Sequence, residues 1–184
     1  MTCEIGMGMK LRFFSTLVLL FALVSCGRTS IPVDKISLSL ASFTENYVDV
    51  SIRLEGSDSE GYFLSAIFTP PDGYHLYSKD IPLNGVEGLG RPTLLELTEY
   101  SQIRALGVLT ESVKTMEPNF EPKELLVYPS GTVTLRSPIE LPAGNTWLDD
   151  TVKVTFMACS ESTCKPPVTG KIVNIRVPSV DVYK

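Results

Sequence analysis

Residues 48–54 read Val-Asp-Val-Ser-Ile-Arg-Leu, so an apolar side chain stands at every second position. A period of two places the apolar side chains on one face of a β-strand and the polar ones on the other. The same alternation recurs in five other stretches, at residues 36–40, 64–68, 133–135, 152–156 and 173–177. The sequence contains no long helical stripe, so we expect a sheet protein whose strands each have one buried face.

Turn-forming residues separate these apolar runs. They cluster at residues 70–73, 129–131, 142–145 and 166–167, where Pro and Gly set the backbone angles of turns. Seven to nine short strands spaced in this way predict an all-β protein, an immunoglobulin-like β-sandwich that forms a single domain over residues 35–184. Residues 84–122 are less regular, and we expect them to form an edge excursion or a long functional loop.

The composition limits the class of protein. The chain has 184 residues, 43% of them hydrophobic and 20% charged, which is enough apolar material for one folded domain. The formal net charge is −5, and the sequence has no cluster of Lys and Arg that would follow a phosphate backbone. We therefore expect no nucleic-acid partner.

The N-terminal region has the features of an export signal. Lys10 and Arg12 precede an apolar run that ends at Cys26 and is too short to cross a membrane comfortably. Residues 1–25 are thus predicted to be a signal peptide, and translation is expected to begin at Met9. An ordinary secretory leader or a retained signal anchor are the alternatives.

The end of this leader resembles the lipobox of bacterial lipoproteins. The resemblance lies in Leu23-Val24-Ser25-Cys26, and it implies that Cys26 is acylated and becomes the N-terminus of a lipidated tether, residues 26–34. Acyl chains hold a protein durably on a membrane surface. Because Gly27 follows the cysteine, and no Asp is present there to retain the protein at the inner membrane, we expect an extracytoplasmic location with the outer membrane favoured.

After Cys26, the remaining cysteines are Cys159 and Cys164, and the compartment in which they would fold is usually oxidising. They lie between strands expected at residues 151–158 and 171–177, at the end of a hairpin. A disulfide there closes a loop of about six residues and contributes roughly 2 kcal/mol, against about 4.7 kcal/mol for a hundred-residue loop. The residues alone leave three interpretations open: a structural bridge, a redox pair and a metal site.

A metal site has little support in the sequence. His75 is the only histidine, which leaves a zinc site short of ligands and excludes a blue-copper centre. Soft ligands for Cu(I) are present at Cys159, Cys164 and Met157. We expect no cofactor and no resident metal.

Two segments resemble the N-terminal periplasmic domain of the thiol-disulfide interchange protein DsbD. They are Val-Thr-Phe-Met-Ala-Cys at 154–159, continued by Cys-Lys-Pro-Pro at 164–167, and Asp-Gly-Tyr-His-Leu-Tyr at 72–77. The resemblance implies an immunoglobulin-like sandwich in which Cys159 and Cys164 are the redox couple. It further implies that Tyr74 and Tyr77 lie beneath or beside the pair.

The same resemblance implies a cap and a set of partners. Phe120 matches an aromatic residue that shields the disulfide, and Glu117 matches, less closely, the acidic residues near it. Such a domain takes electrons from a thioredoxin-like donor or a membrane thiol reductase, here a separate protein, and passes them to oxidised exported client proteins. It is then one component of a thiol-disulfide oxidoreductase system.

Two further functions stay open. The alternatives are an immunoglobulin-like binding or assembly lipoprotein with a structural disulfide, and a Cu(I)-handling lipoprotein.

The charges near the cysteine pair are few. Lys165 is the only close positive charge in the sequence, and Glu161 opposes it. A hairpin supplies no helix dipole, so we expect ordinary thiol acidity.

Overall fold

The computed structural model describes residues 35–183. The predicted signal peptide, Met9, Cys26 and the tether at 26–34 lie outside the described residues. The described part is nearly all β-structure, and its antiparallel sheets pack on each other, which confirms the predicted all-β sandwich. The elements are β1 (Ile36–Glu45), β2 (Val48–Ser57), β3 (Gly61–Thr69), β4 (His75–Leu76), β5 (Leu94–Leu97), β6 (Arg104–Ala105), β7 (Thr110–Glu111), β8 (Val133–Glu140), β9 (Trp147–Phe156), β10 (Ala158–Cys159), β11 (Val168–Pro178) and the 3-10 helix η1 (Val180–Tyr183).

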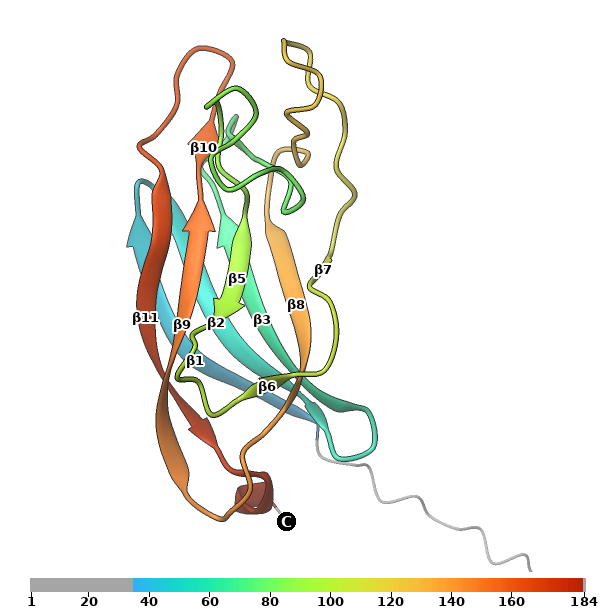
Figure 1. Ribbon diagram of the computed structural model, residues 1–184, viewed down its shortest axis with the longest axis vertical. Helices are drawn as coiled ribbons and strands as arrows, with labels where there is room; N and C mark the ends of the chain where they lie inside the picture. The colour runs from blue at the N-terminus through green and yellow to red at the C-terminus, as the bar shows by residue number, and fades with distance from the viewer. Residues whose placement is uncertain (1–34, 184) are drawn as a thin grey trace, which may run out of the picture. The chain divides into compact units, whose positions relative to one another are not determined.

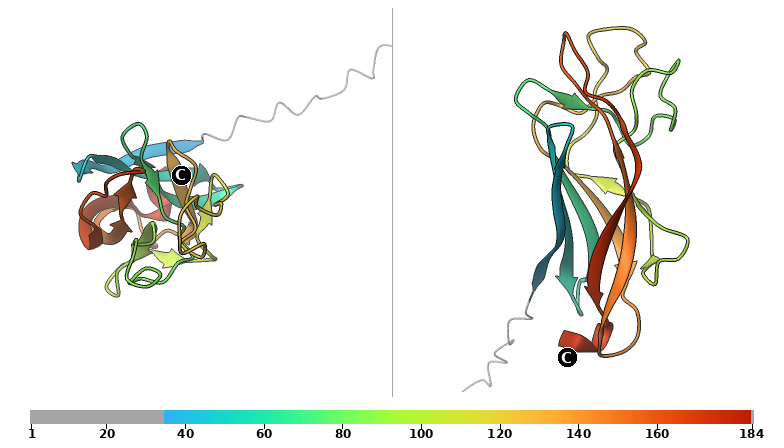
Figure 2. Two further views of the ribbon diagram at one scale, coloured as in Figure 1. Left: turned by 90° about the horizontal axis from the view of Figure 1, so that it is seen from above. Right: turned by 90° about the vertical axis from the view of Figure 1, so that its left-hand side faces the viewer.

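Two sheets form the layers of the sandwich (Figure 1). The larger sheet has the strand order β1-β2-β3-β8-β6, with β7 also pairing with β8, and the smaller sheet has the order β11-β9-β5. Figure 2 shows the layers from the side, with the strands of the larger sheet facing β9 and β11. A third ladder, β10 with β4, extends beyond the end of β9 and carries the cysteine hairpin.

The core lies between the two layers. The apolar residues of the stretch 48–54 are all buried on β2, as their alternation predicts. Phe68 of β3 meets Phe156 of β9 across the core, with ring centroids 5.6 Å apart in an edge-to-face arrangement. Such aromatic pairs add to the free energy gained from apolar burial. These contacts fix the position of the β9 end from which the hairpin starts.

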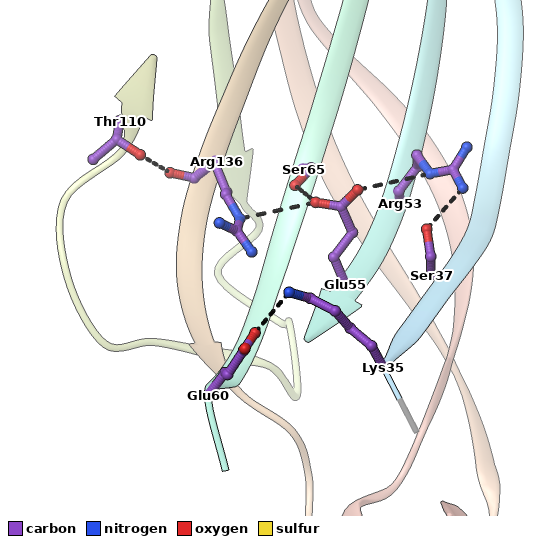
Figure 3. A network of polar contacts seen from close by, with 8 residues as sticks. All are labelled: Lys35, Ser37, Arg53, Glu55, Glu60, Ser65, Thr110 and Arg136. Carbon is purple, nitrogen blue, oxygen red and sulfur yellow. Dashed lines mark hydrogen bonds and ion pairs between the residues drawn. The ribbon is translucent and has the colours of Figure 1, made fainter. Parts of the chain in front are cut away.

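A polar network covers part of the outer face of the larger sheet (Figure 3). The carboxylate of Glu55 lies between two guanidinium groups, 3.9 Å from Nε of Arg53 and 3.8 Å from Nε of Arg136. The buried hydroxyl of Ser65 donates a hydrogen bond of 3.0 Å to the same carboxylate. The network joins β2, β3 and β8.

The structure refines two of the predictions. Residues 35–183 contain eleven strands, more than the seven to nine expected, because the irregular segment 84–122 adds the short strands β5, β6 and β7. The strand predicted to run from 151 to 158 ends at Phe156, and Ala158 and Cys159 pair instead with β4. Within residues 35–183, no helix is long and apolar enough to span a membrane.

Candidate disulfide site

Cys159 and Cys164 form a disulfide within one tight loop, with their Cα atoms 4.0 Å apart. Backbone hydrogen bonds already close this loop, since the amide of Ser160 donates to the carbonyl of Thr163 and the amide of Lys165 donates to that of Ala158, each at 2.8 Å. The bond does not connect the two sheets. Cys159 is only 2% exposed, whereas Cys164 is exposed, so the two sulfur-bearing residues differ sharply in access.

The ladder of β10 and β4 places a histidine beside the buried cysteine. Cys159 lies directly opposite His75, and Ala158 lies opposite Leu76. Leu76 and Ala158 belong to the main core, so they anchor the ladder. Directly opposed residues of an antiparallel pair share one face, with Cβ atoms about 4.5–5.5 Å apart. The His75 and Cys159 side chains therefore lie side by side.

A pocket of about 580 Å³ opens beside the disulfide. Both cysteines line it, together with His75 and Tyr77, the loop at 88–91 and Phe120. Tyr77 is buried and packs with Cys159 in a small apolar cluster of its own. The pocket thus gives a route from solvent to an otherwise enclosed sulfur.

Phe120 stacks on the histidine at the mouth of this pocket. The two ring centroids are 6.0 Å apart with an interplanar angle of 27°, while Tyr77 meets the His75 ring edge-on at 5.4 Å and 84°. Phe120 remains 40% exposed. Its segment is tied down by reciprocal backbone hydrogen bonds between Met116 and Val127.

The structure brings some of the predicted site residues together and separates others. Phe120 and Tyr77 share the pocket with the two cysteines. Glu117 is exposed and lines an adjoining pocket with Phe120 and His75. Tyr74 instead packs against the main core, so it lies beside the hairpin and does not line either of these pockets.

The charges around the site also differ from the prediction. The ammonium of Lys165 lies over two aromatic rings, 4.1 Å from the Tyr47 centroid and 5.1 Å from that of Tyr74. A second cation, Arg91, lines the pocket and donates hydrogen bonds to backbone carbonyls of its own loop, at Asn84, Gly88 and Gly90. Sequence reasoning missed Arg91 because the loop at 84–91 has no regular pattern.

The sequence drew attention to His75 only as the single histidine. In the structure its ring is half-buried, and its Nε2 atom has no hydrogen-bond partner within residues 35–183. Burial lowers the pKa of His75 and raises the pKa of Tyr77. The signal that could have identified His75 is its place between two aromatic residues in the 72–77 segment.

No three His, Cys, Asp or Glu residues gather as a metal-binding group in the part of the chain that the structure describes. Met157 lines the disulfide pocket together with both cysteines, so the three soft ligands named above are neighbours. Searches for a matching protein-family model and for a matching curated protein both find none.

Proposed function

We propose that this protein performs extracytoplasmic thiol-disulfide exchange through Cys159 and Cys164, in the manner of the DsbD N-terminal domain that its sequence resembles. One observation carries the proposal: an exposed Cys164 is bonded to a buried Cys159 at the edge of an apolar pocket. Exchange needs one sulfur that a partner can reach and a second that stays protected until it resolves the mixed disulfide.

In this proposal the exposed cysteine is attacked first, because Cys164 is exposed and Cys159 is buried. A donor thiolate attacks Sγ of Cys164, the accessible residue; a donor–Cys164 bond forms, the Cys159–Cys164 bond breaks, and its electron pair goes to Cys159, which takes up a proton. A second donor thiol then releases Cys164. In the other half-reaction the dithiol reduces the disulfide of an exported client by the same steps in reverse.

A purely structural bridge explains less of the arrangement. The loop is already closed by backbone hydrogen bonds between Ser160 and Thr163 and between Lys165 and Ala158. A loop this short gives a disulfide roughly 2 kcal/mol of stabilisation in the chain-entropy account. A bridge selected for stability would gain more by joining the two sheets of the sandwich.

The surroundings support controlled access to the pair. In this proposal Phe120, which stacks on His75 and lines the same pocket as both cysteines, limits the access of unrelated thiols to the disulfide. Donors and clients are proposed to be a thioredoxin-like protein and oxidised exported proteins. A thioredoxin-like partner fits because it presents an accessible thiolate that can enter the pocket.

The proposed location is a membrane surface facing the periplasm, with Cys26 carrying the lipid. Cys26→Ser should move the protein from the membrane fraction to the soluble exported fraction. A Ser25→Ala variant, which keeps the cysteine and a small residue before it, is the matched control and should stay membrane-bound. A Cys26→Ser protein that remains on membranes would show that the leader acts as a signal anchor.

Trapping tests the exchange directly. Cys159→Ser leaves Cys164 able to form a mixed disulfide that nothing resolves, so acid-quenched extracts of the native host should contain a reductant-sensitive adduct with a thioredoxin-like protein. Cys164→Ser is the matched control, and its buried thiol should give far less adduct. If neither variant yields an adduct, while both fold, the redox assignment is wrong.

A Cu(I)-handling role is a second candidate because Met157 lines the pocket with both cysteines. Thiolate and thioether sulfur are the ligands that Cu(I) prefers. Under this candidate the reduced protein binds one Cu(I) ion, and Met157→Leu weakens that binding without affecting exchange. Weak Cu(I) binding that is equal in wild type and Met157→Leu would remove this candidate.

A further inference from the structure

We propose that His75 is the proton acceptor that activates Cys159 when Cys159 resolves a mixed disulfide held on Cys164. The inference rests on the proposed function, because it assigns a further residue to the same exchange reaction. It begins from the ladder of β4 and β10, where His75 and Cys159 stand directly opposite each other.

The position of the imidazole is fixed on three sides. Its backbone is held by the ladder, its face by Phe120 and its edge by Tyr77. The ring shares the pocket with the disulfide, and side chains directly opposed in a ladder are within contact distance. The imidazole is therefore held beside the buried sulfur, as a proton acceptor must be.

The Nε2 atom of His75 gains a hydrogen-bond partner only when the two cysteines are reduced. Nε2 of His75 is buried and has no hydrogen-bond partner among the described residues while the cysteines are oxidised. A buried polar atom without a partner costs free energy that an apolar residue of similar size would avoid. On reduction, the Cys159 thiol becomes a donor beside this nitrogen, so the missing partner appears in the dithiol state.

The resolving step then balances as follows. Cys164 first loses its proton to solvent and attacks a client disulfide, so a Cys164–client bond forms and one client sulfur leaves with its electron pair and is protonated by solvent. The Cys159 thiol next gives its proton to Nε2 of His75, and its electron pair forms the bond to Sγ of Cys164. The Cys164–client bond breaks, the second client sulfur takes that electron pair, and the imidazolium returns the proton to it. The client gains two thiols and the protein regains its disulfide.

The charged groups around His75 leave it able to accept a proton. Those that share its two pockets are Arg91 from the loop at 88–91, Glu117 and Glu121 from the Phe120 segment, Glu161 from the hairpin, and the phenols of Tyr77 and Tyr128. The three carboxylates are exposed and solvated. Burial lowers the pKa of His75, so the neutral, proton-accepting form predominates near neutral pH.

A two-step optical assay tests the role. Reduced protein is mixed with the aromatic disulfide dithiobis-nitrobenzoate: Cys164 captures one half of the reagent, and Cys159 then expels it, so the second release reports the resolving step. His75→Gln should slow that second release by about tenfold or more near neutral pH and remove the wild-type inflection, which the lowered pKa of His75 places on the acidic side of an ordinary histidine. Glu121→Gln, which removes a carboxylate from the same pocket, should keep the inflection.

Nuclear magnetic resonance of the wild type gives an independent measurement, because His75 is the only histidine and supplies a single imidazole signal. Its titration midpoint should be lower in the reduced protein, where the Cys159 thiol donates to Nε2 and stabilises the neutral imidazole, than in the oxidised protein. An identical midpoint in both states, or an unchanged second release in folded His75→Gln, overturns the role of His75 alone. Absence of a donor adduct in both folded single variants, Cys159→Ser and Cys164→Ser, overturns the exchange function, and this inference with it.

Discussion

Two polar side chains differ in the partners that surround them: Glu55 on the larger sheet and His75 beside the cysteine hairpin. Glu55 has a hydroxyl and two guanidinium groups around its carboxylate (Figure 3). His75 has a buried nitrogen with no hydrogen-bond partner within residues 35–183. Native structures satisfy nearly all buried polar groups, and exceptions concentrate where chemistry takes place. Nε of Arg136 beside Glu55, and Oγ of Ser179, also lack a hydrogen-bond partner within residues 35–183. What distinguishes His75 is that its unpartnered side chain lines the same pocket as the disulfide.

The backbone of the two regions differs in the same sense. The sandwich strands that surround Glu55 are nine or ten residues long on β2 and β3, and they pair without interruption. The hairpin end rests on β4 and β10, which have two residues each. A short ladder has few cooperative hydrogen bonds, so its loops can move while the sandwich stays folded. Under the proposed exchange, a partner would approach the disulfide without unfolding the domain.

The largest loss of stability is expected for a substitution in the core of the sandwich. Phe156→Ala removes a fully buried ring that meets Phe68 edge-to-face. We expect the free energy of unfolding to fall by about 3–5 kcal/mol, measured by urea denaturation of the oxidised protein. A loss below about 1 kcal/mol would mean that the two sheets do not share one core.

The second effect removes the disulfide. The double variant Cys159→Ser and Cys164→Ser should lower the free energy of unfolding by only about 2 kcal/mol, since the closed loop is short. It should remain folded by circular dichroism and lose all thiol exchange. A loss as large as that of Phe156→Ala would make the bridge a major structural element and weaken the comparison.

The third effect tests the polar network around Glu55. Glu55→Ala leaves the buried hydroxyl of Ser65 without its acceptor, so we expect a loss of about 1–2 kcal/mol. Glu140→Ala is the matched control, because Glu140 pairs with Arg104 on an exposed surface and should contribute less than about 1 kcal/mol. Equal effects of the two variants would show that the network around Glu55 adds nothing beyond an ordinary surface ion pair.

The smallest effect on stability comes from Phe120. Phe120→Ala changes a side chain that is already partly exposed, so the free energy of unfolding should change by no more than about 0.5 kcal/mol. The disulfide should nevertheless be reduced faster by dithiothreitol, because the ring no longer stands at the pocket mouth. Phe156→Ala is the control, because it shows whether a loss of folding stability alone makes dithiothreitol reduce the disulfide faster. An unchanged rate in folded Phe120→Ala would remove Phe120 from the site.

The sandwich was predictable because its signal is local. Period-two alternation in residues 48–54 depends only on neighbours along the chain, and the side chains it selects are buried. The hairpin was predictable for the same reason, since Cys159 and Cys164 are five positions apart.

The ladder that completes the site was not predictable in this way. His75 pairs with Cys159, which lies more than 80 positions away, and two-residue strands leave no periodic pattern. Arg91 reaches the pocket from a loop that is shaped by positive-φ glycines, among them Gly85 and Gly90, and not by apolar periodicity. The resemblance to the DsbD domain indicated the cysteines and Phe120, but it assigned no role to His75.

The reduction potential of the Cys159–Cys164 couple tests the central claim most directly. It is measured by equilibrating the purified protein in glutathione or dithiothreitol buffers of graded potential and counting free thiols after acid quenching. A couple that transfers electrons should lie near the thioredoxin value of about −270 mV or above it. A potential below about −300 mV would identify the bond as a structural bridge and contradict the account.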